Sequence, residues 1–231
     1  MERREFVENR PGWREEYGSY VSKLGFFGGQ LAFLADYLPV TTEPLRLLDI
    51  GCAYGMFMRF LRTQNPDLEV CGIEVARDAA EQAMREAGAA ERVAWQGCGD
   101  PFPFPAEYFD GVVCFDVIEH VADNESLRRM IREAARVLKP GGYAFIETPN
   151  YNRRMQWLHR LTGQGHMLKY DHCNLFGERR LAALASDSLA LERVVHRGGV
   201  WLGPRLPDIR ILWPRHFVSG HICAVARKGG R

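Results

Sequence analysis

The chain has 231 residues, 46% of them hydrophobic, which is enough for one domain with a sizeable buried core. Thirty Lys and Arg against 29 Asp and Glu give a formal net charge of +1, so no overall field favours nucleic acid or an anionic membrane. The six cysteines form no C-x-x-C pair, and their spacing is not that of a zinc cluster or a disulfide framework.

The N-terminal segment offers few signals beyond its aromatic content. Residues 1–13 lack the apolar core and cleavage site of a secretory signal, and no later segment approaches about 18 uninterrupted apolar residues. We therefore expect a cytoplasmic protein without a membrane span. An amphipathic stretch at residues 30–38 follows several aromatic side chains and should pack on the body of the domain.

Strand-like and helix-like stretches alternate through the middle of the chain, and this alternation predicts a parallel sheet. Continuous apolar runs should be buried central strands. The predicted strands are Leu45–Ile50, Glu69–Val75, Phe109–Phe115, Tyr143–Thr148, Leu189–His196 and His221–Arg227, with a weaker one at Val93–Gln96. The sequence thus predicts an α/β fold with a doubly wound, mostly parallel sheet of seven strands.

Two helices are predicted between these strands. Apolar side chains recur at helical spacing in residues 126–138, with arginines such as Arg129 available for solvent, and Asp123 or Asn124 can cap the start. The run Lys139–Gly142 ends this helix, since proline cannot continue the ladder and glycine accepts the left-handed turn. The other helix covers about residues 78–87.

The segment Leu47–Phe57, LLDIGCAYGMF, places a small-residue turn between a strand and a helix, where doubly wound folds bind ligands. Gly51 and Gly55 let the backbone approach a ligand, and the helix N-terminus offers N–H groups to a carboxylate. A dinucleotide fingerprint would need glycine in place of Ala53 and Met56, and the G-K-S/T of a phosphate loop is absent. The turn therefore suits a carboxylate better than a pyrophosphate.

Glu74 lies near the end of the second predicted strand, 23 residues after Gly51. A carboxylate at this place can accept hydrogen bonds from both hydroxyls of a ribose. Taken alone, it would more often be a solvated acid at a strand end. Combined with the glycine turn, it indicates an adenosine-containing ligand.

Four motifs then occur in a recognisable order: LLDIGCAYGMF, GIEV, PFPFPAEYFDGVVCFDVIEHV and LRRMIREAARVLKPGGYAFIETPN. With them the chain resembles the class I S-adenosylmethionine-dependent methyltransferases, and most of all the small-molecule branch that includes the ubiquinone-biosynthesis O-methyltransferases. The resemblance covers residues 45–150. It implies a Rossmann-like domain at 45–231, a substrate-side insertion at about 149–188, and a helical lid at 1–44, together one compact domain.

The resemblance also implies S-adenosyl-L-methionine as cofactor and S-adenosyl-L-homocysteine as product. The methionine end is expected at the glycine turn, the ribose at Glu74, the adenine at Val75 and the third strand, and the amino group at the end of the fourth strand. The expected cofactor residues are Asp49, Gly51, Cys52, Ala53, Gly55, Glu74, Val75, Cys98, Gly99, Phe115, Asp116 and Val117.

This sequence departs from the family at two of those places. Ala53 stands where the family usually has glycine, and its methyl group is a small intrusion into the expected cofactor site. Cys98 and Gly99 stand where an acidic side chain usually contacts the adenine, so either their backbone groups suffice or the register shifts and Asp100 takes that contact.

Glu119 and His120, in the run VIEHV, follow the fourth predicted strand, close to where the transferred methyl would lie. Methyl transfer from a sulfonium mainly needs alignment and, for a hydroxyl acceptor, removal of a proton. Histidine suits that step near neutral pH, and Glu119 could orient its ring. The alternative is that His120 only lines the cofactor pocket and Glu119 caps the local turn.

The substrate-side candidates are Tyr17 and Tyr20 from the lid, Asn150 after the fifth strand, and His172 from the long connection that follows. The alternative for the two tyrosines is that both are ordinary helix-packing aromatics. No metal site is predicted, because His166, His172 and Cys173 match no established ligand spacing.

The leading functional prediction is methyl transfer to a small molecule, with oxygen the favoured acceptor atom on a sugar, lipid or secondary metabolite. A nucleic-acid or protein methyltransferase ranks second, since the near-zero charge and the missing N-P-P-Y-type tetrad count against it. A non-catalytic cofactor-binding regulator and an aminopropyl transferase follow. The expected partner is a small-molecule substrate, with no nucleic acid, for a monomer or homodimer.

Overall fold

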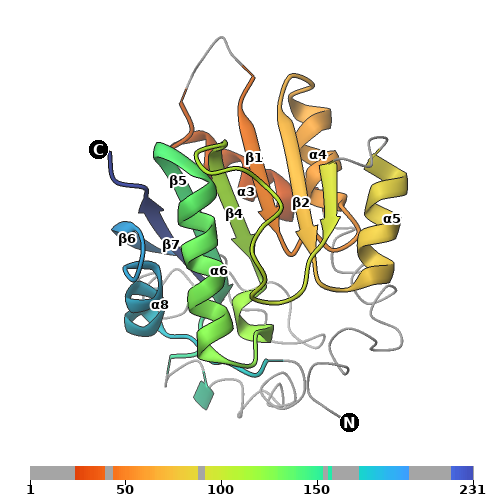
Figure 1. The fold of residues 1–231 in the computed structure, drawn as a ribbon. Coiled ribbons are helices and arrows are strands. Elements are labelled where there is room, and N and C mark those ends of the chain that lie inside the picture. Colours follow the sequence, from red (N-terminus) through yellow and green to blue (C-terminus); the bar gives the residue numbers. More distant parts are fainter. Residues whose placement is uncertain are drawn as a thin grey trace.

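The computed structural model describes residues 24–39, 44–87, 92–152, 156–157, 172–197 and 220–230. Within them, seven strands form one sheet in the order β3-β2-β1-β4-β5-β7-β6 (Figure 1). The strands are β1 (Arg46–Ile50), β2 (Glu69–Glu74), β3 (Val93–Trp95), β4 (Phe109–Phe115), β5 (Leu138–Pro149), β6 (Ala190–Arg197) and β7 (His221–Arg227). Only β7 runs antiparallel to its neighbours β5 and β6, which confirms the predicted mostly parallel sheet.

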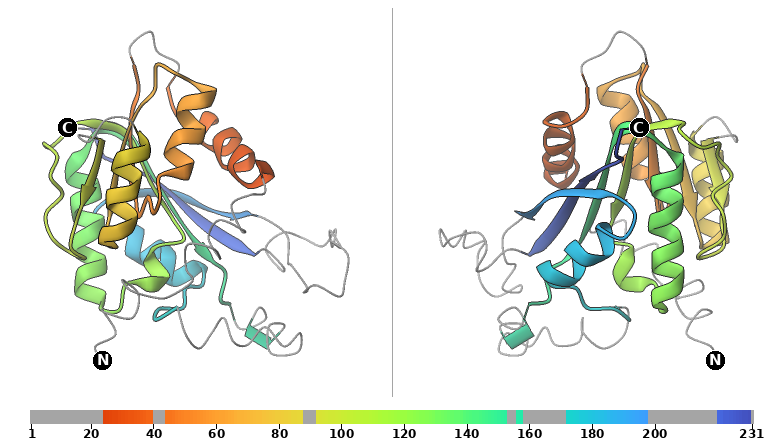
Figure 2. Two further views of the ribbon diagram at one scale, coloured as in Figure 1. Left: turned by 90° about the vertical axis from the view of Figure 1, so that its right-hand side faces the viewer. Right: turned by 60° about the vertical axis from the view of Figure 1, so that its left-hand side comes forward.

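Helices cover both faces of the sheet (Figure 2). On one face, α3 (Leu24–Ala35), α4 (Met56–Gln64) and α5 (Arg77–Ala87) pack over an apolar cluster that includes Leu47, Val70 and Phe145. On the other, α6 (Asn124–Val137) and α8 (Glu178–Ala185) pack over a cluster that includes Leu48 and Val112. Neighbouring residues of β1 thus face opposite layers, as the two-residue period of a strand requires.

The junction between α6 and β5 differs from the sequence prediction. The side chain of Asp123 caps α6 by accepting a hydrogen bond from the Ser126 amide at 2.8 Å, as one of the two predicted caps. The helix ends at Val137, however, and β5 begins at Leu138 rather than at Tyr143. Pro140 and Gly141, whose φ is +79°, are tolerated in the strand because the pairing with β4 shifts register there.

Helix α3 begins earlier in the chain than the predicted amphipathic stretch. Phe27 is buried against the rings of Phe57 and Phe60, and Phe33 packs edge-on against Phe145 of β5. The described part of the predicted lid is therefore fastened to the sheet. Tyr17 and Tyr20 lie outside the described residues. No helix in the described part of the chain has the length and apolar character needed to cross a membrane.

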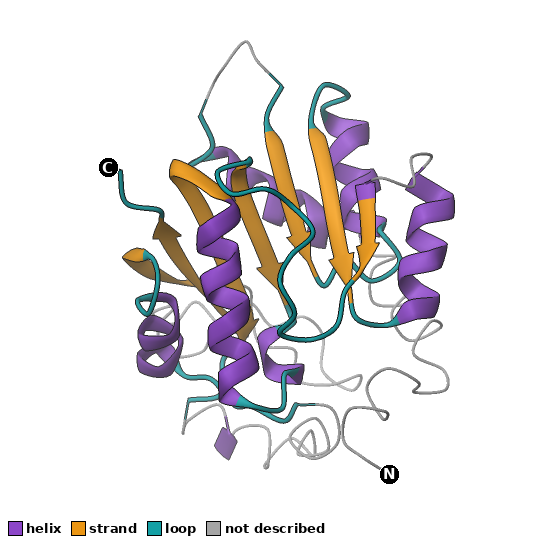
Figure 3. Ribbon diagram, viewed as in Figure 1, coloured by secondary structure: helices purple, strands orange, loops and turns teal. Residues whose placement is uncertain are grey.

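The sheet order places the point of divergence between β1 and β4. The chain leaves β1 toward α4 on one face, and it leaves β4 through the 3-10 turn η2 (Ile118–His120) toward α6 on the other. The connections after β1, β2 and β4 all lie at the same edge of the sheet (Figure 3). Because adjacent strands send their connections to opposite faces, a crevice opens at their carboxyl ends, and ligands bind there in such sheets.

Candidate active site

A cleft of about 660 Å³ lies at this edge, at the carboxyl ends of β1, β2, β3 and β4. Its lining includes predicted site residues from four separate connections. These are Gly51, Glu74, Val75, Cys98, Gly99, Val117 and His120. Residues that were predicted from separate sequence motifs therefore line one cavity.

Gly51 allows the turn after β1 to pass close to the end of β4. Its φ is +75°, and a Cβ atom at this position would lie 2.3 Å from Cγ2 of Val117. The amides of Gly51 and Cys52 both donate to the carbonyl oxygen of Ile73, at 2.8 and 3.1 Å. The turn is thus tied to the end of β2, and only glycine combines that backbone with that proximity.

Glu74 ends β2 and is almost entirely buried. Its Oε2 accepts a hydrogen bond from the Ala53 amide at 2.8 Å, while Oε1 accepts from the amides of Val75 and Ala76 at 2.8 and 2.9 Å. Burial raises the pKa of this carboxyl above its usual range, although the three amide donors oppose the rise. The carboxylate orders the turn and keeps further lone pairs on the wall of the cleft.

Ala53 adopts a left-handed backbone with a φ of +44°, which explains why the family usually has glycine here. Two residues further, Gly55 caps α4 at φ +71° without a side-chain hydrogen bond to the first turn. The leading amides of α4 therefore have no side-chain acceptor at the cap. Such a helix start suits the carboxylate of an amino acid.

Asp49 is buried on β1 and does not belong to the lining of the cleft. Burial, together with the charge of Glu74, raises the pKa of Asp49 to about 7. Burial, together with the charges of Asp49 and Glu74, also raises the pKa of the Cys52 thiol. A bound cation next to Asp49 would favour its ionised form. The expected contact of Asp49 with the methionine end remains a prediction.

The connection after β3 brings both alternative adenine contacts to the cleft. Cys98, Gly99 and Asp100 all line it, so the register question stays open. Gly99 has a φ of +81°, and a Cβ there would lie 2.9 Å from Oγ of Ser126. This connection therefore packs against the first turn of α6.

Sequence reasoning missed several lining residues. Ser126 and Arg129, one helical turn apart on α6, line the cleft, and Nη2 of Arg129 donates to Ser126 Oγ at 3.1 Å. Arg129 is exposed, as predicted, and its place in the cleft lining is the new information. Their i, i+3 spacing was visible, but the orientation of α6 across the sheet was not. Gln96 also lines the cleft; it ends the weakest predicted strand and directly follows the observed β3.

A group of polar side chains, which we name the η2 polar cluster, lies beside the cleft at the carboxyl ends of β4 and β5. Glu119 is fully buried, and its Oε2 accepts a hydrogen bond from Thr148 at 2.9 Å. Asp116, at φ +55°, pairs with His221 of β7 at 3.3 Å. The cluster comprises Asp116, Glu119, His120, Thr148, Tyr151, His172 and His221.

The buried charges in this cluster influence one another. Burial and the charge of Asp116 raise the pKa of Glu119 to about 8. Burial acts to lower the pKa of His221, but Asp116 outweighs it and raises the value to about 9. Burial likewise opposes ionisation of Asp116, yet His221 brings its pKa below the usual value. At neutral pH, Asp116 and His221 therefore form an ion pair beside a largely protonated Glu119.

His120 belongs to both the cluster and the cleft wall, whereas Glu119 and His172 do not line the cleft. The rings of His120 and His172 lie 4.9 Å apart, nearly perpendicular. Asn150 is buried after β5, and its backbone N–H donates to the carbonyl oxygen of Gly220 at 2.9 Å. Tyr151, which sequence reasoning missed, has its hydroxyl 2.5 Å from Nδ1 of His172.

A doubly wound sheet with a glycine turn after β1 and a buried acid at the end of β2 defines a Rossmann-like nucleoside-binding domain. A family profile described as a methyltransferase domain matches residues 24–188. The chain belongs to this methyltransferase domain family, and the predicted class I fold and S-adenosylmethionine dependence are confirmed.

Similar proteins are found among curated sequences and solved structures. The biotin biosynthesis bifunctional protein BioHC of Cellvibrio japonicus is 35% identical over 133 residues, which are 56% of this chain and 25% of that protein. The ubiquinone biosynthesis O-methyltransferase of Yersinia pestis is 26% identical over 127 residues, 54% of this chain and 50% of that protein. The matched segments thus span half or less of these curated relatives.

One solved structure shows how far the likeness of fold extends. The structure of a Thermotoga maritima S-adenosylmethionine-dependent methyltransferase, described as a possible histamine N-methyltransferase, superposes with a TM-score of 0.68. It covers 97% of each chain at 21% identity. At that identity the similarity concerns the fold alone.

Proposed function

We propose that this protein transfers the methyl group of S-adenosylmethionine to a small-molecule acceptor, with oxygen the favoured acceptor atom. One observation carries the proposal: His120 lies on the wall of the cleft and belongs to the η2 polar cluster. A donor in the cleft and an acceptor over the cluster would therefore meet at η2. Proximity of this kind is the main requirement of a displacement at a sulfonium.

Six of the twelve proposed cofactor residues line the cleft, and the other six lie within a few positions of them in the chain. The ribose hydroxyls would donate to Glu74, and the methionine carboxylate would lie at the uncapped start of α4 near Gly55. The adenine would pack near Val75 and the connection at Cys98 and Gly99. Gly51, Cys52 and Ala53 would supply backbone close to the methionine end, with Asp49 behind them. Phe115, Asp116 and Val117 would face the amino group.

The acceptor side is supported by its polarity. An acceptor hydroxyl must lose a proton, and His120 offers a titratable nitrogen at the boundary between cleft and cluster. Glu119 would orient the imidazole, and Asn150 and His172 would contact the acceptor, with Tyr17 and Tyr20 as further candidates from the lid. The name of the Yersinia relative agrees with an oxygen acceptor, and the description of the Thermotoga protein agrees with nitrogen as the alternative acceptor atom.

The test is label transfer from methyl-labelled S-adenosylmethionine, with the full chain incubated in a cell extract. Recovery of the label in small-molecule fractions, followed by identification of the product, would support the proposal. Label in RNA or protein instead would favour the macromolecular alternative. Calorimetric binding of the cofactor without transfer to any fraction would indicate a regulator.

His120→Ala separates chemistry from binding in the same assay. We expect turnover to fall by roughly 10²-fold or more, with cofactor affinity almost unchanged, because positioned proton transfer contributes about 10²–10⁴-fold. His196→Ala, on the far β6 strand beside Glu178, is the matched control. Normal turnover in His120→Ala would restrict His120 to a structural role.

A further inference from the structure

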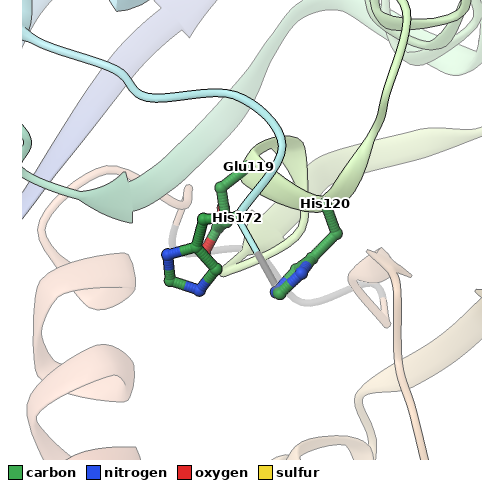
Figure 4. A group of neighbouring side chains, drawn as sticks. All are labelled: Glu119, His120 and His172. Carbon is green, nitrogen blue, oxygen red and sulfur yellow. The ribbon is translucent and has the colours of Figure 1, made fainter. Parts of the chain in front are cut away.

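Three metal-ligating side chains converge in the η2 polar cluster. One ligand atom each from Glu119, His120 and His172 lies within 4.8 Å of the other two. Figure 4 shows the two imidazole rings side by side, with the carboxylate of Glu119 next to His172. We propose that these three residues bind one divalent transition-metal ion, of which Zn²⁺ fits the donor set best.

The geometry suits a site with an open position. Bonds of about 2.0–2.2 Å from zinc to nitrogen or oxygen place neighbouring ligand atoms roughly 3.3 Å apart in a tetrahedron. The ligand atoms lie up to 4.8 Å apart in the structure, and rotations of the side chains would bring them to the tetrahedral spacing. Two imidazoles and one carboxylate fill three positions and leave the fourth for water or substrate, which is the pattern of a catalytic rather than a structural zinc site.

An unsatisfied atom points independently to a ligand. Glu119 is fully buried, and its Oε1 has no hydrogen-bond partner among the described residues, whereas Oε2 is held by Thr148. A buried carboxyl oxygen without a partner is costly, whether or not the group carries its proton. A cation between Glu119 and the two imidazoles would satisfy it.

The ligands are held in place by contacts behind them. The Asn174 amide donates to the carbonyl of Glu119 at 3.0 Å, and its side chain donates to the carbonyl of Val121. These bonds join the segment of His172 to η2. Tyr151 contacts Nδ1 of His172, and metal-ligating histidines are commonly oriented through one ring nitrogen while the other binds the ion.

The choice of ion follows from the donors and the reaction. Imidazole nitrogens favour zinc, copper, iron or nickel over magnesium, which prefers an all-oxygen shell. Methyl transfer needs no change of oxidation state, so an ion without redox chemistry suffices. Zinc meets both conditions.

The role of the ion rests on the proposed function and deepens it. Because His120 lines the cleft, the fourth position would hold an acceptor hydroxyl close to the donor. Coordination lowers the pKa of a bound hydroxyl. The S–CH₃ bond then breaks as the O–CH₃ bond forms, the sulfur keeps the bonding electron pair, and the acceptor proton passes to solvent. His120 would act as a ligand rather than as the base.

The test begins with zinc titration of the full chain, prepared without a polyhistidine tag and treated with chelator. Calorimetry should show about one zinc ion per chain. Affinity should fall at least about tenfold in each of Glu119→Gln, His120→Ala and His172→Ala, since even residues behind a ligand are worth 10–100-fold. Absence of saturable zinc binding in the wild type, or unchanged affinity in all three variants, would overturn the proposal.

Two matched controls exclude other ligands. Cys173→Ser removes the thiol next to His172, and His196→Ala removes a histidine outside the cluster. Both should bind zinc as the wild type does, and loss of binding in Cys173→Ser would contradict the assigned ligand set. If a ligand variant fails to fold, the Co²⁺ spectrum of the wild type still tests the ligand set. A thiolate charge-transfer band would contradict the assignment. Ligand-field bands without a thiolate band would support it.

The metal site and the proposed function fail in different ways. Stoichiometric zinc binding without label transfer would support the site and contradict the methyltransferase proposal. Label transfer at full rate in chelated protein that binds no zinc would leave the proposed function intact and end this inference. Zinc binding with a rate that chelation does not change would refute the catalytic role of the ion.

Discussion

The carboxylate of Glu74 accepts a hydrogen bond of 2.8 Å from the backbone amide of Ala53, so the acid that ends β2 also closes the turn that follows β1. One side chain therefore orders the glycine turn and faces the cleft. Any change at Glu74 must therefore alter both the stability of the turn and the binding of a ligand in the cleft.

Glu74→Ala should weaken binding of S-adenosylmethionine by about 1–3 kcal/mol, because the ribose hydroxyls and the Ala53 amide lose their acceptor. Isothermal titration calorimetry measures the change, and thermal unfolding without cofactor reports the loss of the turn. Glu69→Ala on the same strand is the control, since Glu69 makes a half-exposed pair with Arg46 that contributes little. Unchanged affinity in Glu74→Ala would remove the ribose assignment.

Ala53→Gly should leave the free energy of unfolding unchanged or raise it by up to about 1 kcal/mol. Glycine relieves a left-handed backbone that costs other residues roughly 1–2 kcal/mol, and the greater freedom of the unfolded chain offsets part of the gain. The exposed helical Ala32→Gly should instead lose about 1 kcal/mol. Urea titration compares the two, and equal losses would show that φ at Ala53 is not strained.

Gly51→Ala should destabilise the fold by about 1–3 kcal/mol, because the new Cβ would lie 2.3 Å from Cγ2 of Val117 at a φ of +75°. Adding Val117→Ala removes the opposing methyl group but not the backbone strain. A double-mutant cycle by chemical denaturation should therefore show favourable coupling and incomplete recovery. Strict additivity would mean that the turn shifts away from β4 and that the close approach is not required.

Asp49→Asn should flatten the dependence of stability on pH between about 4 and 7. The pKa of Asp49 in the folded chain is about 7, above its ordinary value of 3.8, so the folded state binds the extra proton within this window. Stability is therefore lost as pH rises, and the neutral amide removes this contribution. Urea unfolding at several pH values measures the slope, with the exposed Asp67→Asn as control. Parallel curves for wild type and Asp49→Asn would contradict the raised pKa.

The sequence by itself determined the elements whose signals are local. The strand at His221–Arg227 and the strand at Phe109–Phe115 have the bounds that were predicted, since an apolar run between polar turn residues is legible over a few positions. The glycine turn and Glu74 were also predicted from local signals. A left-handed backbone favours glycine at one position, and a strand-end acid is recognised from one residue and its neighbours.

Only the tertiary structure decided which distant residues share a site. His120 and His172 lie 52 positions apart in the chain, and Asp116, after β4, meets His221 of β7 across the intervening β5. Periodicity reports which face of its own element a residue occupies, not which other element covers that face. The antiparallel insertion of β7 between β5 and β6 places His221 near Asp116, and the position of α6 brings the exposed Arg129 to the cleft.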